Sequence, residues 1–177
     1  MYKDSYKVFK RISFSDKRGN LSEIYKDSEF QNEVGSNYSF VQENLVLSKQ
    51  NTLRGLHYQI APKMQGKYIS VIIGEIFDVI VDIRANSKNF AKIYCFNLSY
   101  DNLSSLWVPP GFAHGFLTLS EKSIVSYKLT EYYSGAHDRS ILWNSKKLDI
   151  PWPNKTNIVL SDKDKYAKEF DYKESYA

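Results

Sequence analysis

Short β-rich runs separated by turns constrain the fold of this chain more than any other feature of its sequence. From Tyr38 to Tyr127, segments rich in Val, Ile, Phe and Tyr alternate with polar or Gly/Pro turns, at a spacing of roughly 8–12 residues. Helical signals are weak by comparison. The pattern is typical of an antiparallel sandwich or barrel, so we predict an all-β fold with short peripheral helices.

The clearest strand signal comes from the segments Lys67–Ile73 and Ile76–Ile83. A Gly-Glu pair at positions 74–75 separates them and predicts a β-hairpin. In the second segment Asp78 and Asp82 fall on one face of the strand, whereas the opposite face is apolar. Such a strand lines either a polar cavity or bulk solvent, and alternation alone does not distinguish the two.

Two short helices are expected at the periphery of the sheets. Asp27–Val34 accommodates two helical turns with Asp27 or Ser28 as N-cap, and Ser161 caps a second helix within residues 161–170. No linker, repeat or low-complexity segment interrupts the chain. We therefore expect a single domain over residues 1–177.

Charge and cysteine content exclude several classes of protein. The 24 Lys and Arg residues exceed the 20 Asp and Glu residues by four, without any run of like charge, which argues against a nucleic-acid-binding or membrane-binding tail. Cys95 is the only cysteine, so no intrachain disulfide forms and a reducing compartment fits best. Because the sequence lacks a signal-peptide pattern and any run of about 18 apolar residues, we expect a cytoplasmic location.

A histidine in the run Leu53–Gln59 is the first candidate for chemistry. Regular alternation would point Arg54 and His57 to opposite faces, but Gly55 favours a bulge that turns both toward one pocket. A lone histidine is more often a hydrogen-bonded structural residue than a base, and the local pattern leaves both roles open.

The segment Pro109-x-Gly111-x-x-His114 bears on metal binding. Its prolyl turn directs His114 into the space between the sheets. The segment as a whole resembles the second motif of the cupin superfamily. Metal-binding cupins also carry an earlier His-x-His, whereas positions 57–59 here read His-Tyr-Gln. Two candidate histidines remain where a tight transition-metal site usually needs three protein ligands. We therefore expect a cupin-like barrel without a metal site.

Several longer blocks occur in a fixed order along the chain. They are Leu53–Gln59, Gln65–Lys67, Gly74–Arg84, Pro109–Phe116, Tyr127–Tyr133, Ile141–Asn144, Pro151–Pro153 and Leu160–Asp164. Together they resemble the dTDP-4-dehydrorhamnose 3,5-epimerase family of nucleotide-sugar enzymes over about residues 10–165. The resemblance implies a cupin-like jelly roll that forms a homodimer with shared active sites and needs neither metal nor redox cofactor. It also implies an isomerase of deoxysugar biosynthesis, as in the dTDP-rhamnose pathway that supplies O-antigens.

The resemblance further implies roles for individual residues. His57 corresponds to the general base, oriented by Asp164. Tyr127 corresponds to the opposing proton donor, and Lys67 to the lysine beside the 4-keto oxygen of the substrate. The other positions that match substrate-binding residues are Arg18, Glu23, Gln42, Asn44, Arg54, His114 and Lys163, with Arg18 and Glu23 expected to reach across the dimer. Asp138 stands at a further substrate-binding position, where the family usually has the longer Glu. Apart from the resemblance, Tyr132 and Tyr133 are candidates for stacking on the base or for ordinary packing within a strand, and the sequence leaves both roles open.

The chemistry implied by the resemblance accounts for these residue types. A 4-keto group acidifies the hydrogens on the adjacent carbons, so a base removes a proton from one face and an acid returns one to the other. Imidazole titrates near physiological pH, and such proton transfer is worth ~10²–10⁴-fold in rate. A cationic lysine stabilises the enolate oxygen. No oxidation occurs, so no nicotinamide is needed, in keeping with the missing glycine-rich nucleotide loop.

Three alternatives stay open at the level of sequence. Thymidine-binding family members usually have aromatic residues after an early Arg-Gly, whereas Arg18-Gly19 is followed here by Asn-Leu-Ser. The first alternative is therefore a relative that uses a CDP- or GDP-linked sugar, or that inverts only C3 or C5. The second is a non-catalytic sugar-binding cupin, and the third is a metal-dependent cupin oxygenase or isomerase.

Overall fold

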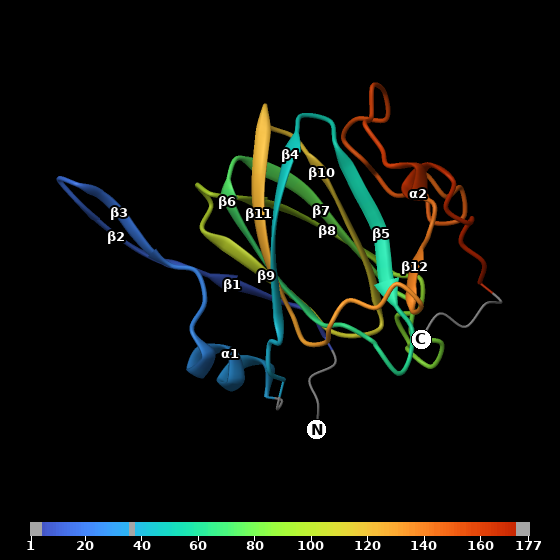
Figure 1. The fold of residues 1–177 in the computed structure, drawn as a ribbon, viewed down its shortest axis with the longest axis horizontal. Coiled ribbons are helices and arrows are strands. Elements are labelled where there is room, and N and C mark those ends of the chain that lie inside the picture. Colours follow the sequence, from blue (N-terminus) through green and yellow to red (C-terminus); the bar gives the residue numbers. More distant parts are fainter. Residues whose placement is uncertain (1–4, 36–37, 173–177) are drawn as a thin grey trace.

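Two antiparallel five-stranded sheets face each other in the computed structural model, which describes residues 5–35 and 38–172 (Figure 1). The first sheet has the order β1 (Lys7–Lys10), β9 (Ser104–Val108), β6 (Lys67–Ile73), β11 (Lys122–Leu129) and β4 (Gln42–Lys49). The second has the order β12 (Asp138–Ser140), β5 (Leu53–Gln59), β10 (Phe112–Thr118), β7 (Glu75–Asp82) and β8 (Ile93–Ser99). The all-β sandwich of jelly-roll type expected from the sequence is thereby confirmed.

Side chains that alternate along the strands fill much of the space between the two sheets. Ile69 and Val71 point inward from β6 and belong to the same buried cluster as Ile80 of β7 and Phe116 of β10. Since each fully buried side chain of this size contributes about 1.5–3 kcal/mol, this cluster fixes the spacing of the sheets. Polar side chains from the same inward faces form a cavity beside it.

Helix α1 (Asp27–Val34) covers the outer face of the first sheet. Phe30 and Val34 of the helix are buried against Phe9 and Trp107. The helix is present as predicted, but its expected N-cap is wrong. Lys26 occupies that position without a side-chain cap, because the Asp27 carboxylate accepts a hydrogen bond from a tyrosine hydroxyl and packing holds the helix in place.

The chain from Ile141 to Phe170 covers the outer face of the second sheet. Trp143, Trp152 and Phe170 are buried in the same cluster as Val79, which points outward from β7. This segment also contains the short helix α2 (Asp162–Lys165), and Ser161 caps it as predicted by accepting a hydrogen bond from the Asp164 backbone N–H. The C-terminal segment therefore places α2 in contact with β5.

The hairpin predicted for Lys67–Ile73 and Ile76–Ile83 is wrong. β6 pairs with β9 and β11, whereas β7 pairs with β10 and β8 in the other sheet. Gly74 alone joins them, with a left-handed φ of 79°, and a Cβ at this position would lie 2.2 Å from the Lys122 carbonyl oxygen. The glycine turns the chain from one sheet to the other. Each of the two strands then lies in the interior of its own sheet, where most of its residues are buried on both faces.

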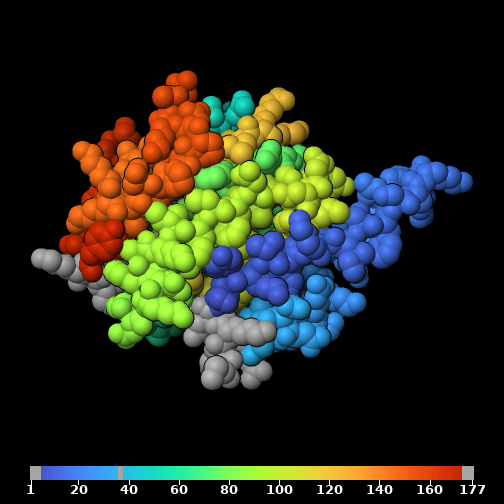
Figure 2. Space-filling view, turned by 180° about the vertical axis from the view of Figure 1, so that it is seen from behind, coloured from blue at the N-terminus to red at the C-terminus, as the bar shows by residue number. Residues whose placement is uncertain are grey.

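A separate two-stranded hairpin, β2 (Ile12–Asp16) and β3 (Gly19–Glu23), projects away from the sheets (Figures 1 and 2). Phe14 and Leu21 stand opposite each other on it and are 59% and 64% exposed. A two-stranded hairpin of this kind has no core of its own. Among residues 5–35 and 38–172, no helix is long and apolar enough to cross a membrane.

Candidate active site

A cavity of about 220 Å³ lies between the two sheets and brings together most of the residues singled out in the sequence. The predicted residues that line it are Asn44, Arg54, His57, Lys67, His114, Tyr127, Tyr133, Asp138 and Lys163. The sequence reasoning had not assigned a site role to Val46, Tyr58, Gln59, Gln65, Phe116 and Leu129, which complete the lining. Residues from strands of both sheets therefore meet in one polar site.

Five predicted residues lie outside this lining, and one of them is the exposed Tyr132. Asp164 stands behind His57, and Gln42 reaches the site through its hydrogen bond to the Asn44 side chain. Arg18 lies in the turn of the projecting hairpin and Glu23 is the last residue of β3, and neither lines the cavity. Within one protomer the structure does not bring these two residues to the cavity.

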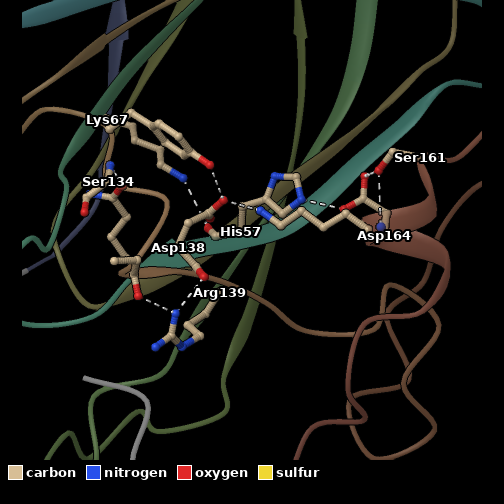
Figure 3. Close-up of polar contacts among 11 residues, drawn as sticks. His57, Lys67, Ser134, Asp138, Arg139, Ser161 and Asp164 are labelled. Carbon is tan, nitrogen blue, oxygen red and sulfur yellow. Dashed lines mark hydrogen bonds and ion pairs between the residues drawn. The ribbon is translucent and has the colours of Figure 1, made fainter.

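The half-buried His57 pairs with the buried carboxylate of Asp164 (Figure 3). His57 Nε2 lies 2.5 Å from Asp164 Oδ1, and the Ser161 hydroxyl donates to the other carboxylate oxygen at 2.9 Å. Burial alone would raise the pKa of Asp164, but hydrogen bonds from His57 and Ser161 outweigh it and lower that pKa. The carboxylate stays ionised and accepts the Nε2–H, which leaves Nδ1 as the nitrogen that can take a proton.

The bulge predicted at Gly55 explains how Arg54 and His57 reach the same cavity. The pairing of β5 with β10 shifts register between His114 and Phe116, next to Gly55, whose φ is 116°. A Cβ on Gly55 would lie 2.6 Å from the backbone of the neighbouring strand, so only glycine fits there. Because the bulge inserts one residue into the alternation, both side chains face inward, and this prediction is confirmed.

Lys67 enters the cavity from the first sheet and is almost fully buried. Its Nζ donates to the backbone carbonyl oxygen of His57 at 3.1 Å. Burial lowers the pKa of Lys67 to about 8, although the negative charges of Asp138 and Asp78 oppose this shift. The side chain is therefore a cation at neutral pH, weakly solvated and close to the base.

His114 forms a second histidine–carboxylate pair with Asp78. The distance from His114 Nε2 to Asp78 Oδ2 is 2.8 Å, and both side chains are buried. Burial lowers the pKa of His114 despite the neighbouring carboxylate, so the ring is neutral at pH 7. Asp78 and Asp82 thus face the interior and not solvent, and Asp82 pairs with Arg84 at the end of its strand.

Tyr133 and Lys163 meet at Asp138 beside the cavity. The Tyr133 hydroxyl donates to Asp138 Oδ2 at 3.1 Å, and the same oxygen forms an ion pair with Lys163. The charge of Asp138 raises the pKa of Tyr133, which keeps the hydroxyl protonated. Tyr133 remains 61% exposed and can contact a ligand.

No metal-binding cluster is found in the part of the chain that the structure describes. Among residues 5–35 and 38–172, no group of three or more His, Cys, Asp and Glu side chains is arranged to hold an ion. His57 and His114 each hydrogen-bond to a carboxylate instead. Chemically, the site offers a base from the second sheet, facing a phenol and a cation from the first.

Known proteins resemble this chain over most of its length, in sequence and in fold. Residues 4–172 match the family model of dTDP-4-dehydrorhamnose 3,5-epimerases. The enzyme of that name from Salmonella typhimurium is 46% identical to this chain, over 89% of this chain and 86% of its own length. A crystal structure of the Bacillus anthracis enzyme with TDP and PPi bound is 46% identical, with a TM-score of 0.89, and the match covers 93% of this chain and 94% of that one. The dTDP-6-deoxy-D-glucose-3,5-epimerase of Legionella pneumophila, in complex with dTDP-4-keto-L-rhamnose, is 39% identical, with a TM-score of 0.89 and coverage of 93% and 87%.

Proposed function

Because this chain belongs to the dTDP-4-dehydrorhamnose 3,5-epimerase family and is a nucleotide-sugar epimerase, we propose that its substrate is a dTDP-linked 4-keto-6-deoxyhexose of the dTDP-4-dehydro-6-deoxy-D-glucose type. The sugar ketone bound in the Legionella enzyme supports this choice. The cavity of this chain also carries cationic side chains, Arg54 and Lys163, that suit a diphosphate.

His57 is the general base in this proposal. Its pairing with Asp164 is the observation that carries the proposed mechanism, because a buried carboxylate fixes the tautomer and stabilises the imidazolium that forms. Nδ1 takes the proton from the carbon next to the ketone, and the electron pair moves onto the keto oxygen. The product of this step is an enolate and a protonated His57.

Lys67 stabilises the enolate, and Tyr127 returns a proton. Lys67 lies on β6 and Tyr127 on β11, neighbouring strands of the first sheet, whereas His57 lies on β5 of the second. A sugar ring held between the sheets presents one face to the base and the other to the phenol. Protonation by Tyr127 on that second face inverts the carbon. His57 then releases its proton to solvent, and the phenolate takes one up from solvent, which restores both groups.

A homodimer completes the site in this proposal. The projecting hairpin exposes Phe14 and Leu21, and β4 at the edge of the first sheet exposes Leu45 and Leu47. Docking of the hairpin on the β4 edge of a second copy would cover both apolar surfaces and protect the strand edge. Since the inward face of β4 lines the cavity, the hairpin would bring its own Arg18 close to the partner's site.

Deuterium uptake tests the proposed reaction. The protein is incubated in deuterated water with 4-keto-6-deoxy sugars linked to dTDP, CDP or GDP, and NMR identifies the carbons that exchange. We expect exchange and inversion at C3 and C5 of the dTDP sugar, and no exchange by a folded His57→Asn variant. Exchange at the wild-type rate in that variant would remove His57 from the mechanism, and a preference for another nucleotide would change the substrate.

A further inference from the structure

Gln59 is a buried polar residue beside the candidate active site that the proposed mechanism does not use. It ends β5, two residues after His57, and its side chain is only 4% exposed. It lines the cavity. A buried carboxamide needs partners for its donors and its acceptor, so the positions of those partners indicate what it holds in place.

The three hydrogen bonds of its side chain all go to loop backbone. Gln59 Nε2 donates to the carbonyl oxygens of Lys63 at 2.6 Å and Tyr132 at 3.2 Å. Its Oε1 accepts from the backbone N–H of Ser134 at 2.7 Å. One side chain therefore holds the backbone on both sides of Tyr133, within a segment, residues 131–134, that we call the tyrosine loop.

Tyr133 is held at two further points. Its backbone N–H donates to Gln42 Oε1 at 3.0 Å, and its hydroxyl donates to Asp138 at 3.1 Å. The ring nevertheless stays mostly exposed at the cavity. The hairpin segment between Arg18 and Glu23 has no aromatic side chain that could stack on a base. The exposed Tyr133 at the cavity is therefore a better stacking surface than that segment.

We propose that Gln59 is a positioning residue that fixes the tyrosine loop, so that Tyr133 forms a rigid stacking face for the nucleobase of the substrate. This inference rests on the proposed nucleotide-sugar substrate. Stacking of a base on an aromatic ring is worth roughly 5- to 150-fold in affinity. Gln59 therefore controls nucleotide binding, whereas proton removal by His57 does not depend on the loop.

Calorimetric titration with dTDP alone tests the proposal. Gln59→Met keeps the length of the side chain and removes all three hydrogen bonds, and we expect its Kd for dTDP to rise at least roughly fivefold. Tyr133→Ala should show a rise of at least this size. In the double variant the two effects should not multiply, because Gln59 acts through Tyr133. Gln50→Met is the matched control, because Gln50 donates to the Leu119 carbonyl oxygen at the surface, outside the cavity lining. This variant should leave the Kd unchanged.

Catalysis provides the second readout. With the dTDP sugar, Gln59→Met should raise KM by about the same factor as the dTDP Kd, with kcat for deuterium exchange within roughly twofold of wild type. An unchanged dTDP Kd in folded Gln59→Met, or effects that multiply fully with those of Tyr133→Ala, would overturn the positioning role. If Gln59→Met does not fold, Gln59→Glu replaces it, because it keeps the acceptor for Ser134 and loses both donors. Failure of the proposed substrate is distinguishable, because wild-type protein would then not bind dTDP.

Discussion

Replacing Asp164 with Asn tests the histidine–carboxylate pair most directly. The carboxylate accepts on both oxygens, from His57 Nε2 at 2.5 Å and from the Ser161 hydroxyl at 2.9 Å. An amide has one acceptor oxygen and one NH₂ donor. Whichever way the amide lies, either His57 or Ser161 loses its acceptor, and the negative charge that stabilises the imidazolium is gone.

The size of the effect follows from the strength and exposure of this contact. A hydrogen bond to a charged group is worth about 1.5–3 kcal/mol, which corresponds to roughly 10- to 150-fold in rate. The equivalent substitution in a serine-protease triad costs about 10⁴-fold. Here the His57 side chain is 32% exposed, so water partly solvates the imidazolium. We therefore expect kcat to fall about 100-fold in Asp164→Asn.

The assay is deuterium exchange at C3 and C5 in deuterated water, followed by NMR at saturating dTDP sugar. Ser161→Ala is the control, because it keeps the carboxylate and removes one neutral donor, and its rate should fall less than about tenfold. Circular dichroism establishes that both variants are folded. A folded Asp164→Asn enzyme that exchanges within about threefold of the wild-type rate would refute the reasoning.

Three further outcomes are expected. Tyr127→Phe should retain exchange with solvent but lose inversion, because the base still acts while the opposite acid is missing; equal, undiminished rates of both in one NMR sample would place the acid elsewhere. Because burial lowers the pKa of Lys67 to about 8, the cation is lost as pH rises through that value, and kcat/KM should fall there. Lys67→Arg should move this alkaline limb to higher pH, and a wild-type profile flat to about pH 10 would contradict the assignment. Phe14→Ser combined with Leu21→Ser should increase the monomer fraction in sedimentation and make activity fall on dilution. The exposed Val159→Ser should change neither quantity, and a double variant that stays dimeric would argue against hairpin exchange.

The sequence by itself determined the features that depend on neighbours along the chain. Alternation of apolar residues identified the strands, and Gly55 signalled the bulge that turns Arg54 and His57 to one side. Ser161 was recognisable as a helix cap because a cap bonds within three residues. Ordered blocks of residues carried the family resemblance, and that resemblance predicted most of the residues that line the cavity.

Only the tertiary structure decided which distant segments meet. The sequence predicted a hairpin around Gly74, because alternation says nothing about which sheet a strand joins. In the structure β6 pairs with β9 and β11, whereas β7 pairs with β10 and β8, so the two strands belong to different sheets. Likewise, only the structure showed that Asp78 is buried against His114, 36 residues along the chain, so that its face of β7 points to the interior and not to solvent. The bonds of Gln59 across the tyrosine loop had no local signal, because His-Tyr-Gln reads only as an incomplete metal motif. Such contacts depend on how the sheets pack, and packing is a property of the whole chain that no short window of sequence contains.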